Sequence, residues 1–441
     1  MDTLIYAAGV VVFFLGLMAS IGLHEVGHMW PAKRFGVKVT EYFVGFGRRL
    51  WSVRRGETEY GIKLIPLGGY VKLVGMLPPV AGGTDGAGDP DHPRKVRSSN
   101  TGMFTQLVAD ARAAEYENVL PGEEDRLFYR KPWWQKLVVM TGGPLVNVVI
   151  AAFLFGVLIM GVGVPGEPTT TVETVSDCVV PADREQQTCL ASDPVSPAAR
   201  AGLQPGDEIK TFNGTPVTSW DQLTELIRAN ESGDATIAIE RDGRPSTLTT
   251  NTTVSLRESL DDPEGFVEVG FLGVSPTRPY ERGTPVDVAM TMGSLIKLTG
   301  AAILDLPERM VGVARAAVGA EREPNSPVSV VGASRVAGEL VSDERSPWVA
   351  RVSDVVGLLA SVNLFIAIFN FLPVLPLDGG HIAGALWEAL RRGWARLRGR
   401  PDPGYFDVGK LLPLAYAFGS VLVVMGLLLV WTDIVNPVRL E

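Results

Sequence analysis

Four long apolar runs separate polar stretches of very different lengths along the chain. They cover residues 4–23, 137–161, 352–372 and 412–432, and the first contains no charged residue. A helix needs about 20 apolar residues to cross the hydrocarbon core of a bilayer, so each run is predicted to be a transmembrane helix. The two residues before the first run are not basic, and we therefore expect a retained helix rather than a cleaved signal peptide.

The polar stretches differ in charge, and this difference predicts how the chain crosses the membrane. Lys and Arg are abundant in 29–136 and 377–411, whereas acidic residues outnumber basic residues in 165–350, and the net charge is −9. Because basic loops stay in the cytoplasm, the first two segments are predicted to be cytoplasmic and 165–350 to lie outside, with both termini. The acidic balance gives no reason to expect a nucleic acid partner.

The outer segment is predicted to contain a small α+β domain. Apolar residues alternate in DEIKTFNG and ATIAIE, as in half-buried strands, while SWDQLTELIRAN begins with a serine cap and continues at helical spacing. The stretch AGLQPGDEI at 201–209 resembles the loop-and-strand signature of PDZ domains, which bind extended peptides at a sheet edge. Cys178 and Cys189 both lie in this segment, and an oxidising compartment favours a disulfide between them.

Two further segments are predicted to lie at the membrane surface. EYGIKLIPLGGYVKLVG alternates apolar and polar residues on both sides of Gly68 and Gly69, which predicts a β-hairpin centred on these glycines. Residues 286–320 mix apolar stripes with Lys297, Asp305 and other charges, which favours amphipathic helices outside. These charges argue against a fifth transmembrane helix without excluding it.

The first apolar run ends in HEVGH, which is a candidate metal motif. His24 and His28 are four residues apart, so on a helix both face one side and can bind one metal ion, with Glu25 beside them. Ionisable residues inside a membrane helix are costly and usually functional. A hydrolytic zinc ion usually has three protein ligands and keeps one position for water. A third ligand is therefore expected elsewhere in the chain.

The third apolar run ends in NFLPVLPLDGGHIAG, where Asn370, two prolines and two glycines interrupt the helical pattern. Irregular backbone at membrane depth is tolerated only where protein or a water-filled cavity surrounds it. Asp378 is therefore the leading candidate for the third ligand, and His381 is the competing one.

These motifs, together with IPLGGYVKLVG at 65–75 and GGPLVN at 142–147, resemble the site-2 protease family of intramembrane zinc metalloproteases. The likeness is greatest to bacterial members that cut anti-sigma factors, in particular the actinobacterial branch with a single PDZ domain. The resemblance implies Zn²⁺ bound by His24, His28 and Asp378, with Glu25 as the general base. Asn370 is implied to bind substrate, as are Gly68 and Gly69. Asn147 is expected to have a structural role in helix packing.

The implied function is a zinc endopeptidase of the bacterial plasma membrane that cleaves single-pass membrane proteins, such as anti-sigma factors, in the lipid bilayer. Its active site would lie near the cytoplasmic side and its PDZ domain outside, where that domain could bind a peptide. The alternative is a catalytically inactive PDZ membrane scaffold or chaperone. A metal transporter would be expected to place its ligands along a path, whereas here they cluster at one depth.

The expected fold is a polytopic α-helical membrane protein with about four transmembrane helices, an inserted α+β PDZ domain and a membrane-associated β-hairpin. In chain order we expect a first transmembrane helix in 1–36, the hairpin in 37–76, a cytoplasmic linker in 77–131, a second transmembrane helix in 132–164, the PDZ domain in 165–285, amphipathic helices in 286–350, a third transmembrane helix in 351–380, a cytoplasmic loop in 381–411 and a fourth transmembrane helix in 412–434.

Overall fold

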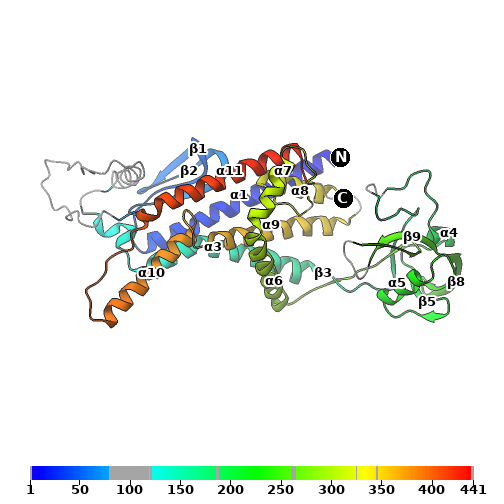
Figure 1. The fold of residues 1–441 in the computed structure, drawn as a ribbon. Helices are drawn as coiled ribbons and strands as arrows, with labels where there is room; N and C mark the ends of the chain where they lie inside the picture. The colour runs from blue at the N-terminus through cyan, green and yellow to red at the C-terminus, as the bar shows by residue number, and fades with distance from the viewer. Residues whose placement is uncertain are drawn as a thin grey trace. The chain divides into compact units, whose positions relative to one another are not determined.

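The chain is divided into two compact units, which we call the helical unit and the α+β unit (Figure 1). The helical unit comprises Met1–Gly161 and Thr284–Glu441, and the α+β unit comprises Val162–Gly283. The computed structural model describes residues 2–78, 119, 122–184, 188–259, 265–323, 325–343 and 346–438. Most of the linker expected in 77–131 lies outside the described residues.

The helical unit contains long apolar helices and several shorter ones. In chain order they are α1 (Asp2–Arg34), α3 (Trp133–Gly156), α6 (Pro285–Leu304), α7 (Leu306–Ala316), α8 (Val330–Ser342), α9 (Trp348–Asn370), α10 (Asp378–Leu397) and α11 (Leu412–Val435). Short helical turns flank them: η1 (Glu124–Arg126), η2 (Phe128–Arg130), η3 (Val157–Val162) and η4 (Val408–Leu411).

Five helices in the described part of the chain are long and apolar enough to cross a membrane. Four correspond to the apolar runs of the sequence, and the fifth is α6. The charges that argued against a span at α6 are mostly not in it: Asp305 follows its last residue and Glu308 lies in α7. Segment 381–411, expected as a loop, begins with the helix α10 instead.

Glycines let α1 and α3 pack in backbone contact at the level of HEVGH. A Cβ atom on Gly27 would lie 2.4 Å from the carbonyl oxygen of Gly142, and one on Gly142 would lie 2.0 Å from that of Gly27. Larger residues at either position would push the two helices apart. Helix α3 also packs against α9 and α10.

Strands β1 (Val39–Arg55) and β2 (Thr58–Leu73) pair with each other after α1. The chain does reverse near Gly68 and Gly69, because residues 60–62 of β2 run parallel to 42–44 of β1 whereas residues 69–71 run antiparallel to them. The flanking segments each pair with β1 instead of with each other, so they do not form the expected two-stranded hairpin. A second reversal lies between Arg55 and Thr58. Gly56 there has a φ of 63°, a value that favours glycine. Val44 is paired with both Gly69 and Ile62, so the middle of β1 lies between two parts of β2. In the described residues, no third strand joins this sheet, so residues 69–73 form one of its edges.

The α+β unit has a mixed architecture, as its alternating pattern predicts. Its strands are β3 (Val164–Pro165), β4 (Val172–Val175), β5 (Glu208–Phe212), β6 (Thr215–Pro216), β7 (Asp234–Arg241), β8 (Arg244–Asn251), β9 (Thr253–Glu258), β10 (Phe266–Phe271), β11 (Val274–Pro276) and β12 (Tyr280–Glu281). Its helices are α4 (Pro197–Ala201) and α5 (Trp220–Ala229). The core contains Ile209, Leu223 and Ile237. The cap of α5 is Ser219, as expected, and Cys178 and Cys189 form the expected disulfide.

Candidate metal centre

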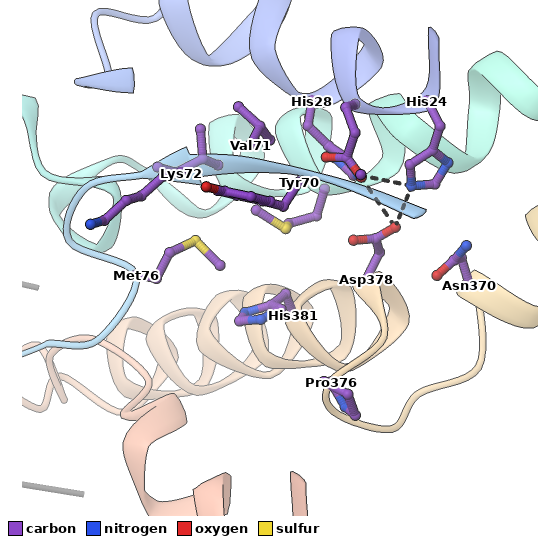
Figure 2. A pocket seen from close by; sticks show the side chains of 14 residues that line it. His24, His28, Tyr70, Val71, Lys72, Met76, Asn370, Pro376, Asp378 and His381 are labelled. Carbon is purple, nitrogen blue, oxygen red and sulfur yellow. Dashed lines mark hydrogen bonds and ion pairs between the residues drawn. The ribbon is translucent and has the colours of Figure 1, made fainter. Parts of the chain in front are cut away.

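Helices α1 and α10 bring three side chains to one point. His24 and His28 are one turn apart on α1, and Asp378 is the first residue of α10 (Figure 2). The two Nε2 atoms lie 3.2 Å apart, and each lies 3.3 Å from Oδ2 of Asp378. The histidines are only 8% and 5% exposed. Residues separated by about 350 positions in the sequence thus form one buried cluster.

The cluster fits a zinc ion. Two imidazole nitrogens and a carboxylate oxygen are a donor set that zinc accepts, and ligand atoms about 2.0–2.1 Å from a tetrahedral zinc lie roughly 3.3 Å from one another. Oδ2 of Asp378 is buried without a hydrogen-bond partner in the described structure, which a cation would compensate. His381 lines the same cavity, but it does not belong to the group whose ligand atoms lie within 4.8 Å of one another.

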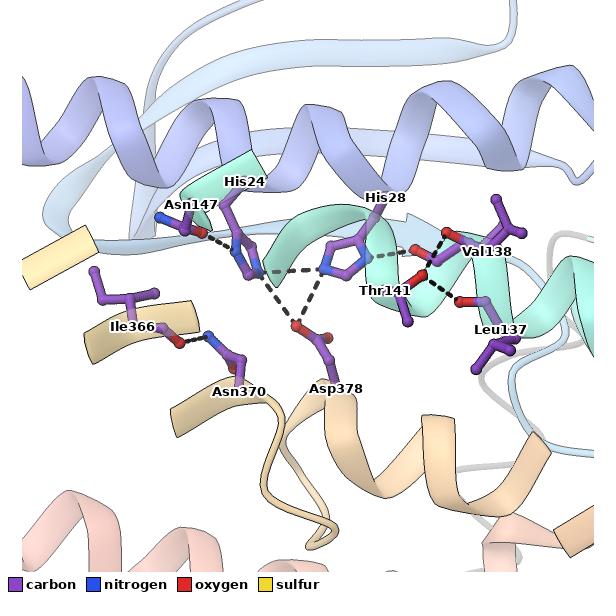
Figure 3. Close-up of polar contacts among 10 residues, drawn as sticks. His24, His28, Leu137, Val138, Thr141, Asn147, Ile366, Asn370 and Asp378 are labelled. Carbon is purple, nitrogen blue, oxygen red and sulfur yellow. Dashed lines mark hydrogen bonds and ion pairs between the residues drawn. The ribbon is translucent and has the colours of Figure 1, made fainter. Parts of the chain in front are cut away.

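Hydrogen bonds orient both histidines toward this point (Figure 3). Nδ1 of His24 lies 2.6 Å from Oδ1 of Asn147, and Nδ1 of His28 lies 2.8 Å from the carbonyl oxygen of Val139. Because both partners are acceptors, each Nδ1 carries the proton and each Nε2 offers its lone pair. Asn147 in turn donates from Nδ2 to Oδ1 of Asn363, at 2.9 Å.

This relay corrects the expectation that Asn147 only packs helices. Asn147 and Asn363 are both fully buried, and together they link α1, α3 and α9. Asn363 was not among the residues expected at the site. The available signal was a polar amide inside an apolar run, which in a membrane helix favours a hydrogen-bonded role.

We expect Asn147→Leu to weaken zinc binding by about 10–100-fold, because His24 would lose the acceptor that fixes its tautomer and orientation. The measurement is zinc affinity by competition with a chelator, on the purified full chain. Asn370→Leu is the matched control, since Asn370 lines the cavity beside the cluster but has no hydrogen bond to either histidine in the described structure; its Nδ2 donates to the carbonyl oxygen of Ile366. Equal zinc affinity in Asn147→Leu and the wild type would contradict the relay.

A cavity of 520 Å³ opens beside the cluster (Figure 2). Glu25, Gly69 and Asn370 line it together with the three clustered residues. A Cβ atom on Gly69 would lie 3.1 Å from Cγ of Glu25, so β2 passes directly over the HEVGH motif. Gly68 does not line the cavity, and its missing side chain makes room for the ring of Phe46 instead. Of the two glycines expected at the substrate, the structure brings only Gly69 to the site.

Hydrogen bonds between side chains of β1 and β2 fix the edge of β2 that lines this cavity. The hydroxyl of Tyr70 donates to Glu41 and accepts from Nζ of Lys63. Burial and the Glu41 carboxylate raise the pKa of Tyr70, so the hydroxyl stays protonated at neutral pH. This part of the wall therefore keeps its hydrogen bonds under physiological conditions.

Comparison with known proteins places the chain in a family. The model of "Peptidase family M50" matches residues 12–400. The chain is 34% identical over 448 residues to "Zinc metalloprotease Rip1" of Mycobacterium tuberculosis (strain ATCC 25618 / H37Rv), covering 99% of this chain and 100% of that protein. It is 32% identical to the protein of the same name in Mycolicibacterium smegmatis, with coverage of 99% and 100%.

A more distant relative is "Regulator of sigma-W protease RasP" of Bacillus subtilis (strain 168), which is 24% identical and matches 87% of this chain and 90% of its own length. The likeness to these proteases extends over both units. Together with the family match and the apolar helices, it means that the chain belongs to peptidase family M50, the site-2 proteases, and is a multi-pass zinc metalloendopeptidase of the plasma membrane.

Proposed function

We propose that His24, His28 and Asp378 hold the zinc ion and that Glu25 is the general base for hydrolysis of a peptide bond. The observation that carries this assignment is the convergence of three ligand atoms within 4.8 Å of one another. Glu25 lines the same cavity and is not one of the three. It is thus free to exchange protons while the ligands hold the metal.

When bound, the zinc ion lowers the pKa of a coordinated water to about 7 and polarises the scissile carbonyl. Glu25 accepts the proton of the attacking water and passes it to the leaving amine. No covalent bond to the protein is needed. Asn147 and Val139 keep the two histidines in the tautomer that leaves Nε2 available.

Residues 69–73 of β2 provide a binding surface for the substrate backbone. A peptide bond in a helix is protected by the hydrogen bonds of that helix, so the substrate must unwind before it is cut. An open strand edge can pair with the unwound segment, and Gly69 through Leu73 line the cavity beside the ligands. At Gly69 the missing side chain lets the substrate approach Glu25. We assign the amide of Asn370, at the end of α9, to the same substrate segment.

The proposed substrate class is a single-pass membrane protein of the anti-sigma factor type. The Bacillus subtilis relative is named a regulator of sigma-W protease, and this chain resembles it over most of its length. We place the metal centre near the cytoplasmic face and the α+β unit outside the cell, because Lys and Arg are concentrated in 29–136 and 377–411.

We expect the purified full chain, in nanodiscs, to cleave a single-pass substrate whose helix contains a Gly-Pro pair at least tenfold faster than one with an uninterrupted Leu helix. The reason is that unwinding is cheaper where Gly and Pro weaken the helix. Cleavage is measured by gel and mass spectrometry, with and without a zinc chelator. If the zinc-loaded protein cleaves neither substrate, the inactive scaffold becomes the better account.

We further propose that the α+β unit is a PDZ domain that binds a peptide carboxylate. A cavity of 140 Å³ between α5 and the β10–β11 segment is lined by Trp220, Ile227 and Phe271 and by Arg257. Nε and Nη2 of Arg257 are buried and have no hydrogen-bond partner in the described structure, and its guanidinium carbon lies 3.7 Å from the centre of the Phe271 ring. Burial and the nearby Arg228 lower the pKa of Arg257. A peptide carboxylate would accept hydrogen bonds from both Nε and Nη2 of Arg257.

We expect Arg257→Met to weaken binding of peptides with a free C-terminal carboxylate by about tenfold, because a charge-assisted hydrogen bond is lost. The measurement is fluorescence polarisation on the full chain, with free and amidated forms of each peptide. Arg244→Met is the control, since Arg244 does not line the cavity. Loss of binding on amidation identifies the terminal carboxylate, and loss on replacing an acidic side chain identifies that group. An unchanged affinity in Arg257→Met would reject the assignment.

A further inference from the structure

Helix α10 presents a broad apolar face that no other part of the described chain covers. Trp387, Leu390, Trp394 and Leu397 are between 53% and 84% exposed. They recur at intervals of three and four residues, so they lie on one side of the helix. The opposite side, which contains Gly384 and Glu388, is buried, and α10 packs against α3. In a protein of the plasma membrane, such a face is suited to contact with lipid.

An apolar cavity of 420 Å³ adjoins this face. Its lining includes Ala383 and Trp387 of α10, Phe406, and Leu414 at the start of α11. Residues 373–375, in the turn that leads to Asp378, form its other wall. The cavity therefore lies behind the turn that carries a proposed metal ligand, and its lining offers no charged group.

A second cavity, of 870 Å³, shares Phe406 and Leu411 with the first. Its lining carries three cations, Arg130, Arg391 and Lys410, and two carboxylates. Arg130 is paired with Asp125 at 3.3 Å, whereas the guanidinium of Arg391 donates to the carbonyl oxygen of Pro403. In the described residues, neither Arg391 nor Lys410 takes part in an ion pair.

We propose that the two cavities together hold one anionic phospholipid. Its phosphate lies between Arg391 and Lys410, beside the aromatic rings that line the second cavity. One acyl chain occupies the apolar cavity. Lys410 precedes the first residue of α11 by two positions, which is where a headgroup meets the end of an apolar span. Cationic side chains at a bilayer surface favour anionic over zwitterionic lipids. The apolar cavity next to the cations selects a lipid over a free phosphate.

The test compares lipid retention by native mass spectrometry of the full chain, purified with equal amounts of phosphatidylglycerol and phosphatidylcholine. We expect the wild type to retain one phosphatidylglycerol, with a preference of about tenfold or more. The double variant Arg391→Gln/Lys410→Gln should lose this preference. The control Arg396→Gln/Arg398→Gln also removes two positive charges, at the C-terminal end of α10 and outside both cavities, and it should keep the preference.

Two further variants and one competition experiment distinguish a bound lipid from the alternatives. Arg391→Lys/Lys410→Arg conserves the charge and should restore the preference, which separates a lost charge from a damaged fold. Ala383→Phe fills the apolar cavity and should reduce retention of the lipid while the zinc content stays constant. Glycerol phosphate at millimolar concentration should not displace the lipid. Equal retention of the two lipids by the wild type, equal loss of the preference in Arg391→Gln/Lys410→Gln and Arg396→Gln/Arg398→Gln, or displacement by glycerol phosphate would overturn the proposal.

Discussion

Glu25→Gln is expected to retain zinc at the wild-type level and to lower the rate of substrate cleavage by about 10²–10⁴-fold, the usual contribution of a general base. Glutamine has nearly the same shape but cannot accept the proton of the attacking water. The three ligand atoms come from His24, His28 and Asp378, so the metal should remain bound. Because Gly69 lies against the side chain of Glu25, the substituted residue should also keep its position in the cavity.

The measurement combines zinc content by elemental analysis with single-turnover cleavage of a membrane substrate in nanodiscs. Glu308→Gln provides the control, because Glu308 is exposed on α7 and lies outside the cavity. It should cleave at the wild-type rate. Wild-type cleavage by Glu25→Gln with full zinc occupancy would remove Glu25 from the mechanism. Loss of zinc in this variant would instead make Glu25 part of the metal centre.

The candidate ligands could be predicted from the sequence because their geometry is local. Spacing of four residues places His24 and His28 on one side of a helix. Asp378 stands out because it interrupts an apolar run. Spacing alone does not decide between Asp378 and His381, because they are only three residues apart. The structure distinguishes them by distance, because only Asp378 reaches the two histidines.

The contacts of Asn147 could not be predicted in the same way. The hydrogen bond between His24 and Asn147 joins residues 123 positions apart, and it depends on how closely α1 approaches α3. That approach is set by Gly27 and Gly142. A sequence pattern records that such residues are small or polar, but it does not record which helices they bring together.

The errors in the fold have similar causes. A hairpin was expected around Gly68 and Gly69 because adjacent glycines commonly mark turns; the chain does reverse there, but each half of β2 pairs with β1 and not with the other half. The span at α6 was discounted because nearby charges were counted within it. Helix α10 was expected as part of a cytoplasmic loop because segment 381–411 is basic and lies between two apolar runs. In each case the residue types of the segment were recognised from the sequence. What the sequence did not provide was the tertiary contact or the exact end of a helix.

The second large effect is expected at Gly143, where Gly143→Ala should strongly weaken zinc binding and therefore slow cleavage. A Cβ atom at this position would lie 2.2 Å from Nε2 of His28 and 2.7 Å from Nε2 of His24. These are the atoms assigned to the metal, and both rings are fixed by hydrogen bonds at Nδ1. The methyl group can be accommodated only by turning the rings away. We expect zinc affinity to fall by at least about 100-fold, the upper end of what loss of ligand orientation causes.

Two neighbouring substitutions separate this effect from a general loss of folding. Gly156→Ala changes the same helix where nothing lies within 4 Å of the new Cβ, so zinc binding and stability should be unchanged or slightly improved by the better helix propensity of alanine. Gly142→Ala would place its Cβ 2.0 Å from the carbonyl oxygen of Gly27, and it should lower thermal stability by separating α1 from α3. Gly143→Ala should differ from both, with a folded protein that has lost its zinc. If Gly143→Ala binds zinc as tightly as Gly156→Ala, then Nε2 of the two histidines does not face the metal, and the ligand assignment fails.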